Sequence, residues 1–502
     1  MEEISESAQR RILFVVVVGT LMTAIDSTIM VLALPTVGQD LNANLSTIIW
    51  TILIYLLLSA VLTTQFGRTG DIYGRARMFN LGFVIFTIAS GAAGFSPNAT
   101  FLIAFRGIQA IGGSLMFANG GAIIADTFPA TRRGRAFGFT TMGWSVGAIL
   151  GILLGGVITT LVGWRYIFFI NVPIGVLAIP LGFSTLKDRI RVPSTIDGGG
   201  FALLSASLGM VSYGAIDVAS YGLRSLNMAL LVVGAALLVP FAWWETRARN
   251  PMLNLKLLRD RQLGLSLTSA LLQSIGYLSV IFLLTMYLQG VRGLSPLDAS
   301  LLLVPAYVVS SFLSPAMGRW SDRLGAHVVA TWGIALMLAG VLSYAFFSVT
   351  TPLFWVVVVS LVTGFGGAMY WPANTAAIMA RSQPGTYGAI SGLRATLTNV
   401  GWLLSFVIAL VVASAAIPRY VAFEVFLGTT HLVGGLGAEF LNGLHAALIV
   451  SAVILAVAGV VSYSRGRPQP VLQASSDTAT SPRLSSGNPT ETATEASAAH
   501  LR

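Results

Sequence analysis

The chain alternates between long apolar runs and short polar connections. A helix needs about 20 mostly apolar residues to cross a bilayer, because its backbone polar groups must pair within the segment. Fourteen runs meet this requirement, at 12–34, 47–66, 79–96, 101–123, 137–160, 167–186, 199–219, 226–244, 265–288, 299–317, 327–349, 354–380, 388–414 and 444–463. The pattern therefore predicts an all-α polytopic membrane protein with 14 transmembrane helices.

The composition agrees with this pattern and excludes an ordinary water-soluble protein. Hydrophobic residues make up 55% of the 502 residues and charged residues 10%, whereas soluble domains carry about 25% charged residues. Mean hydropathy is +0.80. The net charge of +10 is spread over many connections instead of lying on one face, so no nucleic-acid partner is expected.

Lys and Arg are distributed unevenly between alternate connections. With the N-terminus inside, the outer connections hold only four of the 29 basic residues, namely Arg165, Arg224, Arg292 and Arg419. Basic connections resist translocation and stay in the cytoplasm. We therefore expect a multi-pass protein of the cell (plasma) membrane with both termini in the cytoplasm.

The predicted helices divide the chain into five parts. A cytoplasmic N-terminal segment is followed by a six-helix bundle, an inner linker with two additional helices, a second six-helix bundle and a tail, at 1–11, 12–186, 187–245, 246–467 and 468–502. The tail is rich in Ser, Thr, Ala and Pro and is predicted to be disordered and cytoplasmic. The outer segment 415–443 is too long for a simple turn, and its stretch Tyr420–Leu427 is interpreted as a strand or a re-entrant hairpin.

A short motif, G-x-x-x-D-x-x-G, occurs once in each predicted bundle, on the inner connection after the second helix. Its glycines permit tight turning, and its Asp can cap a helix or pair with a nearby Arg. Two copies at matching positions indicate an internal duplication, which is the common plan of secondary transporters. The motif residues and their adjacent arginines are Gly67, Asp71, Gly74 and Arg75, and Gly318, Asp322, Arg323 and Gly325.

Residues 12–465 resemble the major facilitator superfamily, and within it the fourteen-helix drug:proton antiporters. The resemblance is carried by the motif around Gly67 and by TAIDSTIMVLALP, LIAFRGIQAIGG, GWRYIFFINVPIG and YLQGVRGLSPLDASLLLVP. It implies two six-helix bundles, built as inverted repeats around a central cavity, with two extra helices between them. It also implies proton-coupled efflux of amphipathic cationic or neutral drug-like compounds by alternating access.

Asp26 lies near the middle of the run 12–34. Inserting an Asp there costs about 2.5–3.5 kcal/mol, so its carboxyl group should face protein or a water-filled path. The resemblance implies a role in proton coupling or in recognition of cationic substrates. The alternative is a purely structural polar group that is satisfied by Ser, Thr or backbone between helices.

Arg106 lies near the outer end of the run 101–123, and Gln109 and Gly113 share its helix face. This polar and small stripe points toward the interior of the bundle. The resemblance implies that Arg106 relays protons. The alternative is that Arg106 extends its side chain to the outer membrane surface.

Four glycines recur every fourth residue on the fifth predicted helix, at Gly143, Gly147, Gly151 and Gly155. Such a stripe allows close approach of another helix, and it resembles the motif that separates exchangers from symporters. Ile152 stands where that motif usually has Pro, and Ile72 replaces a usual Arg of the loop motif. A general helix contact explains the glycines equally well.

Aromatic side chains with sparse polar groups are typical of cavities for amphipathic ligands, including cations held over ring faces. Arg394 is either a residue that reaches the inner surface or a cavity residue that favours an anionic or zwitterionic ligand. The predicted substrate cavity comprises Trp50, Tyr55, Gln109, Gln273, Tyr277, Tyr370, Trp371, Asn374, Arg394, Asn399 and Trp402.

Other functional classes find less support in the sequence. The four His residues are scattered without metal-ligand spacing, and no phosphate-binding glycine loop occurs. We therefore expect neither an enzyme nor a cofactor or metal site, and the expected partners are a small-molecule substrate, protons and the lipid bilayer, with the protein a monomer. A channel would need a filter-like repeat. The remaining alternative is an exporter or facilitator of a metabolite, sugar or lipid-like molecule without strict proton coupling, for which a midplane Asp26 is not needed.

Overall fold

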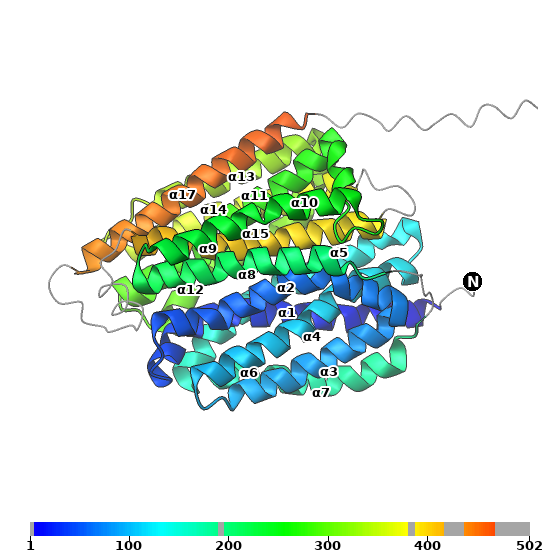
Figure 1. The fold of residues 1–502 in the computed structure, drawn as a ribbon, viewed down its shortest axis with the longest axis horizontal. Helices are drawn as coiled ribbons and strands as arrows, with labels where there is room; N and C mark the ends of the chain where they lie inside the picture. The colour runs from blue at the N-terminus through cyan, green and yellow to red at the C-terminus, as the bar shows by residue number, and fades with distance from the viewer. Residues whose placement is uncertain (1–4, 189–194, 380–386, 416–435, 467–502) are drawn as a thin grey trace, which may run out of the picture. The chain divides into compact units, whose positions relative to one another are not determined.

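A computed structural model describes residues 5–188, 195–379, 387–415 and 436–466. These residues form helices and connections, and none of them lies in a β-strand. Fourteen helical segments of the described chain are long and apolar enough to cross a membrane (Figure 1). The predicted all-α fold with 14 spans is confirmed.

The N-terminal half consists of six spans. They are α1 (Glu6–Asp40), α2 (Leu45–Tyr73), α3 (Arg75–Gly94), α4 (Ala99–Thr127), α5 (Ala130–Leu161), and a sixth span made of α6 (Tyr166–Phe169) and α7 (Asn171–Thr185). Helix α1 packs along α5, while α4 packs against both α2 and α3. The sixth span closes the half by packing on α1 and α3.

The C-terminal half repeats this plan. After the short helix η1 (Leu255–Arg259), its spans are α11 (Arg261–Thr285) continued by the π-helix η2 (Met286–Val291), α12 (Pro296–Leu324), α13 (Ala326–Tyr344), α14 (Leu353–Met379), α15 (Tyr387–Ala415) and α17 (Leu436–Ser464). Helix α14 packs against α12 and α13, and α11 packs between α15 and α17.

The two halves meet along two helix pairs. The fifth helix of the N-terminal half, α5, packs on the second helix of the C-terminal half, α12. The reciprocal pair, α2 and α15, forms the other contact. In each pair, the second helix of one half packs against the fifth helix of the other, as expected for two halves built on the same plan. We call the end of the bundle that carries Gly74 and Gly325 the inner end, and the end that carries Asp40 the outer end.

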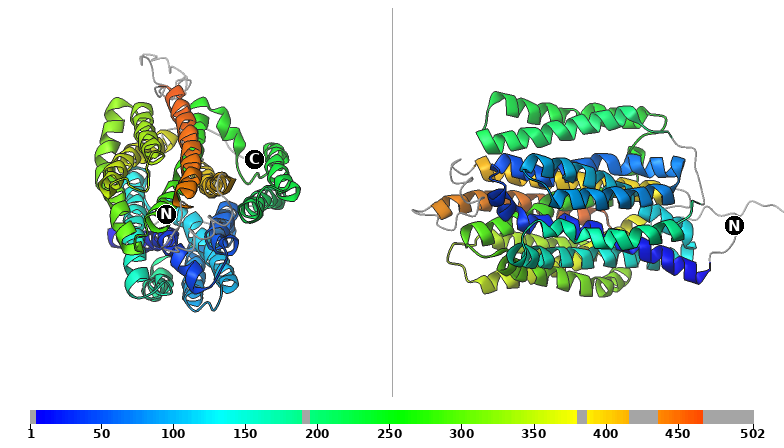
Figure 2. Two further views of the ribbon diagram at one scale, coloured as in Figure 1. Left: turned by 90° about the vertical axis from the view of Figure 1, so that its left-hand side faces the viewer. Right: turned by 90° about the horizontal axis from the view of Figure 1, so that it is seen from below.

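The additional pair of spans lies at the edge of the bundle (Figure 2). Helix α8 (Gly198–Tyr221) packs on α2 and α15, and α9 (Ser225–Ala236) with α10 (Leu238–Arg247) forms the second span. Asp197 anchors the pair because its carboxylate accepts hydrogen bonds from Gly200 N at 2.9 Å, Trp244 Nε1 at 2.9 Å and Met252 N at 3.1 Å. Its carbonyl oxygen accepts a hydrogen bond from Gln65 Nε2 of α2. The pair is therefore tied to the N-terminal half at the inner end.

The glycine stripe of α5 lies against α1. A Cβ atom at Gly147 would stand 2.6 Å from the Leu21 carbonyl oxygen, and one at Gly151 would stand 2.6 Å from that of Ile25. Gly143 and Gly155 border Val17 and Ile29 of the same helix. The stripe thus brings the backbone of α5 against the turn of α1 that carries Asp26.

The structure corrects the boundary of the predicted outer segment 415–443. Helix α17 begins at Leu436, because the helix continues beyond the apolar run that defined the membrane span. The stretch Tyr420–Leu427 and the tail 468–502 lie outside the described residues.

Candidate functional site

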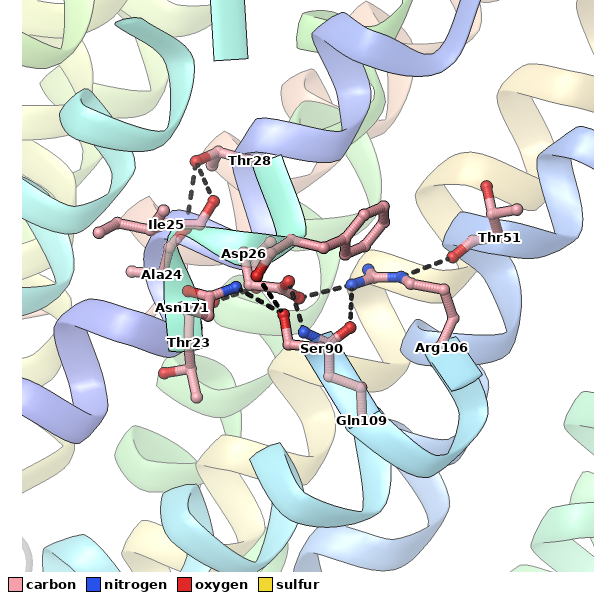
Figure 3. A network of polar contacts seen from close by, with 12 residues as sticks. Thr23, Ala24, Ile25, Asp26, Thr28, Thr51, Ser90, Arg106, Gln109 and Asn171 are labelled. Carbon is pink, nitrogen blue, oxygen red and sulfur yellow. Dashed lines mark hydrogen bonds and ion pairs between the residues drawn. The ribbon is translucent and has the colours of Figure 1, made fainter. Parts of the chain in front are cut away.

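Asp26 is buried in the N-terminal half, with a fully inaccessible side chain. Its two carboxylate oxygens have different donors: Arg106 Nη1 lies 2.6 Å from Oδ2, and Gln109 Nε2 lies 2.7 Å from Oδ1 (Figure 3). The sequence could not place Asp26 and Arg106 in contact, and the fold brings them together. The result is a charge-assisted pair, which is the stronger class of hydrogen bond.

Arg106 is 2% exposed and does not reach the outer surface. Besides Asp26, its Nη1 donates to Gln109 Oε1 at 2.7 Å, and its Nε donates to the Thr51 carbonyl oxygen at 3.1 Å. The guanidinium lies 4.5 Å from the ring centroid of Tyr55. The interpretation of Arg106 as a side chain that extends to the membrane surface is therefore wrong.

Three helices contribute to this site. Helix α1 supplies Asp26, α2 supplies Tyr55 and the Thr51 carbonyl, and α4 supplies Arg106 and Gln109. Gly113 makes room for the Tyr55 side chain, because a Cβ atom there would stand 2.7 Å from the Tyr55 hydroxyl oxygen. A polar stripe and a small residue on one face of α4 thus build one buried cluster.

Sequence reasoning missed a second buried polar contact in the N-terminal half. Asn171 Nδ2 donates to Ser90 Oγ at 3.1 Å, and Ser90 Oγ donates to the Phe168 carbonyl at 2.9 Å (Figure 3). Both side chains are fully buried. Asn171 belongs to GWRYIFFINVPIG, so the signal was present in that motif.

The loop motif of the N-terminal half forms a charged cluster at the inner end. Arg75 pairs with Asp71 at 2.7 Å and with Asp126 of α4 at 2.5 Å, so one guanidinium joins the ends of three helices. Gly74 forms the link between α2 and α3 with φ of 111°. Asp188, after the sixth span, caps α3 by accepting a hydrogen bond from Ala76 N at 2.8 Å.

The loop motif of the C-terminal half has a similar glycine link between its helices. Gly325 links α12 to α13 with φ of 94°. Gly318 borders Pro372 of α14, as Gly67 borders Ala118 of α4. Arg323 is exposed, and the side chain of Asp322 lies outside the described part of the chain.

The predicted cavity residues divide into three groups. Tyr55 and Gln109 belong to the Asp26 site, while Asn399 and Trp402 contact the N-terminal half: Asn399 Nδ2 donates to Thr63 Oγ1 at 3.3 Å, and Trp402 stacks on Trp144. Trp144 was missed, because a single Trp beside a glycine stripe carries no distinguishing pattern. Trp50 is half-buried and packs against the main apolar core.

The third group lies in the C-terminal half. Gln273, Tyr370 and Asn374 are buried there: the amide of Gln273 faces Met337 Sδ, the Tyr370 hydroxyl lies 3.3 Å from Ser269 Oγ, and Asn374 Oδ1 accepts a hydrogen bond from Arg465 at 2.6 Å. Tyr277, Trp371 and Arg394 are half-buried.

No group of three His, Asp or Glu side chains in the described segments has the geometry of a metal site. The described residues of the N-terminal half instead hold a buried carboxylate and guanidinium between their helices. Two repeated helical halves with ionisable groups buried between the spans are typical of membrane transporters.

The family follows from comparison with known proteins. The sequence profile of the Major Facilitator Superfamily matches residues 16–406, and the chain belongs to this family. The fold is similar to that of a bacterial homologue of the human lysosomal transporter Spinster in an inward-facing, unoccupied conformation, with a TM-score of 0.66, 16% identity and coverage of 93% of this chain and all of that one.

Several curated relatives are named for export or resistance. The tetracenomycin C resistance and export protein of Streptomyces glaucescens is 28% identical, over 78% of this chain and 73% of its own length. The multidrug resistance protein Stp of Mycobacterium tuberculosis is 27% identical, over 96% of this chain and 95% of its own length. Another relative, the riboflavin transporter RibZ of Clostridioides difficile, is 28% identical over 78% of this chain and 86% of its own length.

Proposed function

We propose that the protein exports amphipathic cationic or neutral compounds across the plasma membrane in exchange for protons. The proposal rests on one observation, the buried contact of Asp26 with Arg106 and Gln109. Both termini lie in the cytoplasm in this proposal, as the distribution of basic residues predicts. The names of relatives that export tetracenomycin C or confer multidrug resistance favour drug-like substrates.

The Asp26 site provides a physical basis for coupling. Removing one partner of a buried ion pair costs about 3–5 kcal/mol, because the other charge is left without compensation. A proton that arrives on Asp26 removes its negative charge, and Arg106 keeps Gln109 Oε1, the Thr51 carbonyl and the Tyr55 ring as partners. Protonation therefore weakens the contact between α1 and α4, while the guanidinium keeps neutral hydrogen-bond partners and loses its counterion.

The transport cycle follows from these two charge states. A proton from the outer side neutralises Asp26 while substrate leaves, and the protonated protein returns to the state that is open to the cytoplasm. There Arg106 and the incoming substrate favour the ionised carboxylate, and the proton is released inward. One charge that moves down 100 mV supplies about 2.3 kcal/mol, which sustains a gradient of roughly fiftyfold.

Transport by Asp26→Asn protein in proteoliposomes tests this function. With an imposed pH gradient, we expect the variant to lose gradient-driven transport while its thermal unfolding remains cooperative. Asp40→Asn is the matched control, because Asp40 lies on the same helix and pairs with Arg165 at 2.7 Å in a half-exposed position. Gradient-driven transport that survives in Asp26→Asn would contradict the proposal.

A second candidate function is export or facilitated diffusion of an endogenous metabolite without strict proton coupling. The similarity to a riboflavin transporter is the observation that favours it. Under this alternative, Asp26→Asn and wild-type protein carry substrate equally well, with or without a pH gradient.

A further inference from the structure

Two tryptophans from opposite halves stack on each other. Trp144 lies on α5 and Trp402 on α15, with ring centroids 5.6 Å apart and an interplanar angle of 22°. Phe117 of α4 lies edge-on against Trp144, with centroids 6.2 Å apart. The separation and angle are those of an offset stack, which is a favourable aromatic geometry.

The stack lies on the face of α15 that meets the N-terminal half. Three residues before Trp402, Asn399 Nδ2 donates to the Ser59 carbonyl and to Thr63 Oγ1 of α2. Four residues after it, Phe406 lines a small apolar pocket shared with Leu34 of α1. Spacing of three and four residues keeps these side chains on one helix face.

The residues on this face of α15 contact apolar groups toward the outer end and polar groups toward the inner end. The pocket nearer the outer end is lined by the apolar residues Leu34, Ile49, Ile52, Phe282, Phe406 and Leu410. The contacts nearer the inner end involve amide and hydroxyl groups, with Thr64 and Thr396 also in contact. The Trp pair lies between this apolar pocket and the polar contacts.

The two tryptophans and the adjacent Phe117 are less buried than Phe406 of the apolar pocket. Phe117 is 37% exposed, whereas Phe406 is 6% exposed, and both tryptophans are half-buried. The two indoles, one from each half, are therefore in contact with each other without being fully enclosed by the surrounding helices.

We propose that Trp144 and Trp402 form a sandwich site for planar aromatic compounds, which enter between the two indoles when the halves separate. This inference rests on the proposed export function and adds its substrate class. An aromatic layer needs about 3.5 Å of additional separation. The ligand replaces one stacked contact by two, and a positive charge on it gains from both ring faces.

The two rings belong to different halves, so ligand thickness sets how far the halves stand apart. A flat molecule is held by both indoles at once, whereas a molecule with rings in several planes contacts only one of them. The pair therefore selects for planarity.

Binding by full-length protein in lipid nanodiscs tests the site without any gradient. The planar probes are ethidium and riboflavin, and tetraphenylphosphonium is a cation whose rings are not coplanar. We expect Trp144→Leu and Trp402→Leu each to weaken ethidium binding at least about fivefold, as loss of an aromatic stacking partner does, with less than about twofold change for tetraphenylphosphonium. Phe at either position should restore part of the affinity.

Trp332→Leu is the matched control, since Trp332 on α13 is 63% exposed. Ethidium affinities of the two stack variants equal to that of Trp332→Leu would overturn the site. An equal loss for ethidium and tetraphenylphosphonium would also overturn it, because the pair would then act only as a contact between halves. Wild-type protein that binds neither planar probe would overturn the proposed substrate class.

These outcomes are separate from the test of export. Failure of proton coupling appears as undiminished gradient-driven transport by Asp26→Asn protein. Failure of the sandwich site appears in equilibrium binding, where Asp26→Asn and the Trp variants are measured independently.

Discussion

The two halves of the protein share a backbone plan and differ in how they use charge. Each joins its second helix to its third through one glycine with positive φ, Gly74 or Gly325. The N-terminal half buries Asp26 against Arg106 and joins Asp71, Arg75 and Asp126 at its inner end. Among the residues of α11 to α17 whose side chains are described, no carboxylate is buried.

In the described part of the C-terminal half, the buried arginine Arg465 donates its hydrogen bonds to neutral groups. Arg465 is 5% exposed and donates to Asn374 Oδ1 at 2.6 Å, to Ser266 and Ser462 hydroxyls, and to the Ala326 carbonyl. These acceptors keep one protonation state at ordinary pH. Duplication thus preserved the helix packing and the glycine turns, while among the side chains that the structure describes in the two halves, the buried carboxylate lies in the N-terminal half.

The largest expected effect is on the charged pair of the N-terminal half. Arg106→Leu leaves Asp26 buried and uncompensated, which should cost about 3–5 kcal/mol of stability. The double variant Asp26→Leu with Arg106→Leu should recover most of this loss, because neither charge remains. Thermal unfolding of the purified proteins measures the loss in Arg106→Leu and its recovery in the double variant. An Arg106→Leu protein as stable as wild type would contradict the pairing of Arg106 with Asp26.

A smaller effect is expected for the neutral network of the C-terminal half. Arg465→Leu leaves hydrogen-bond acceptors such as Asn374 Oδ1 without their donor, at a cost of about 1–3 kcal/mol. The same unfolding measurement applies. A loss as large as that of Arg106→Leu would mean that Arg465 has a charged partner, and the contrast between the halves would break.

The two linking glycines sharpen the comparison further. Gly325 has φ of 94° and ψ of 134°, a conformation that residues with a side chain rarely adopt, so Gly325→Ala should lose about 1–3 kcal/mol. Gly74→Ala should lose more, because its Cβ atom would collide with the Asp188 carboxylate that caps α3, whereas at Gly325 it would stand 3.1 Å from the His327 ring. Equal unfolding temperatures for the two variants would show that the Asp188 contact adds nothing.

The smallest effect concerns Asp197, which ties the additional helices to the N-terminal half. Burial alone would raise its pKa, but hydrogen bonds from Gly200, Trp244 and Met252 and the charge of Arg68 outweigh burial and lower the pKa of this carboxyl group. Its ionised form therefore stabilises the fold above the unfolded pKa of about 3.9, and this stabilisation is lost as pH falls through the lower folded value.

Asp197→Asn tests this pH dependence. We expect the variant to be less stable than wild type by under about 1 kcal/mol at pH 7, and the difference should narrow below about pH 4. Unfolding temperatures measured from pH 3 to 7 report it. A difference that widens on acidification would contradict the direction of the shift.

Sequence reasoning was strongest where the signal is local. The spans follow from runs of apolar residues, and the duplicated loop motif lies within eight residues of sequence in each half. It was weaker where one side chain must be oriented: Arg106 had two interpretations, and only its contacts with Asp26 and Thr51 decided between them. Tyr370 and Asn374 carried the same aromatic and polar signals as Trp402, yet they pack within the C-terminal half.

The chain by itself determined the number of membrane spans, the repeated halves and the presence of a carboxyl group in the middle of the first span. Those features depend on residues that are neighbours in sequence, since each helix satisfies its own backbone. The tertiary structure alone decided that Asp26 meets Arg106, 80 positions away, and that Trp144 meets Trp402. Such contacts depend on the rotation and register of packed helices, which the periodicity of a single helix leaves open.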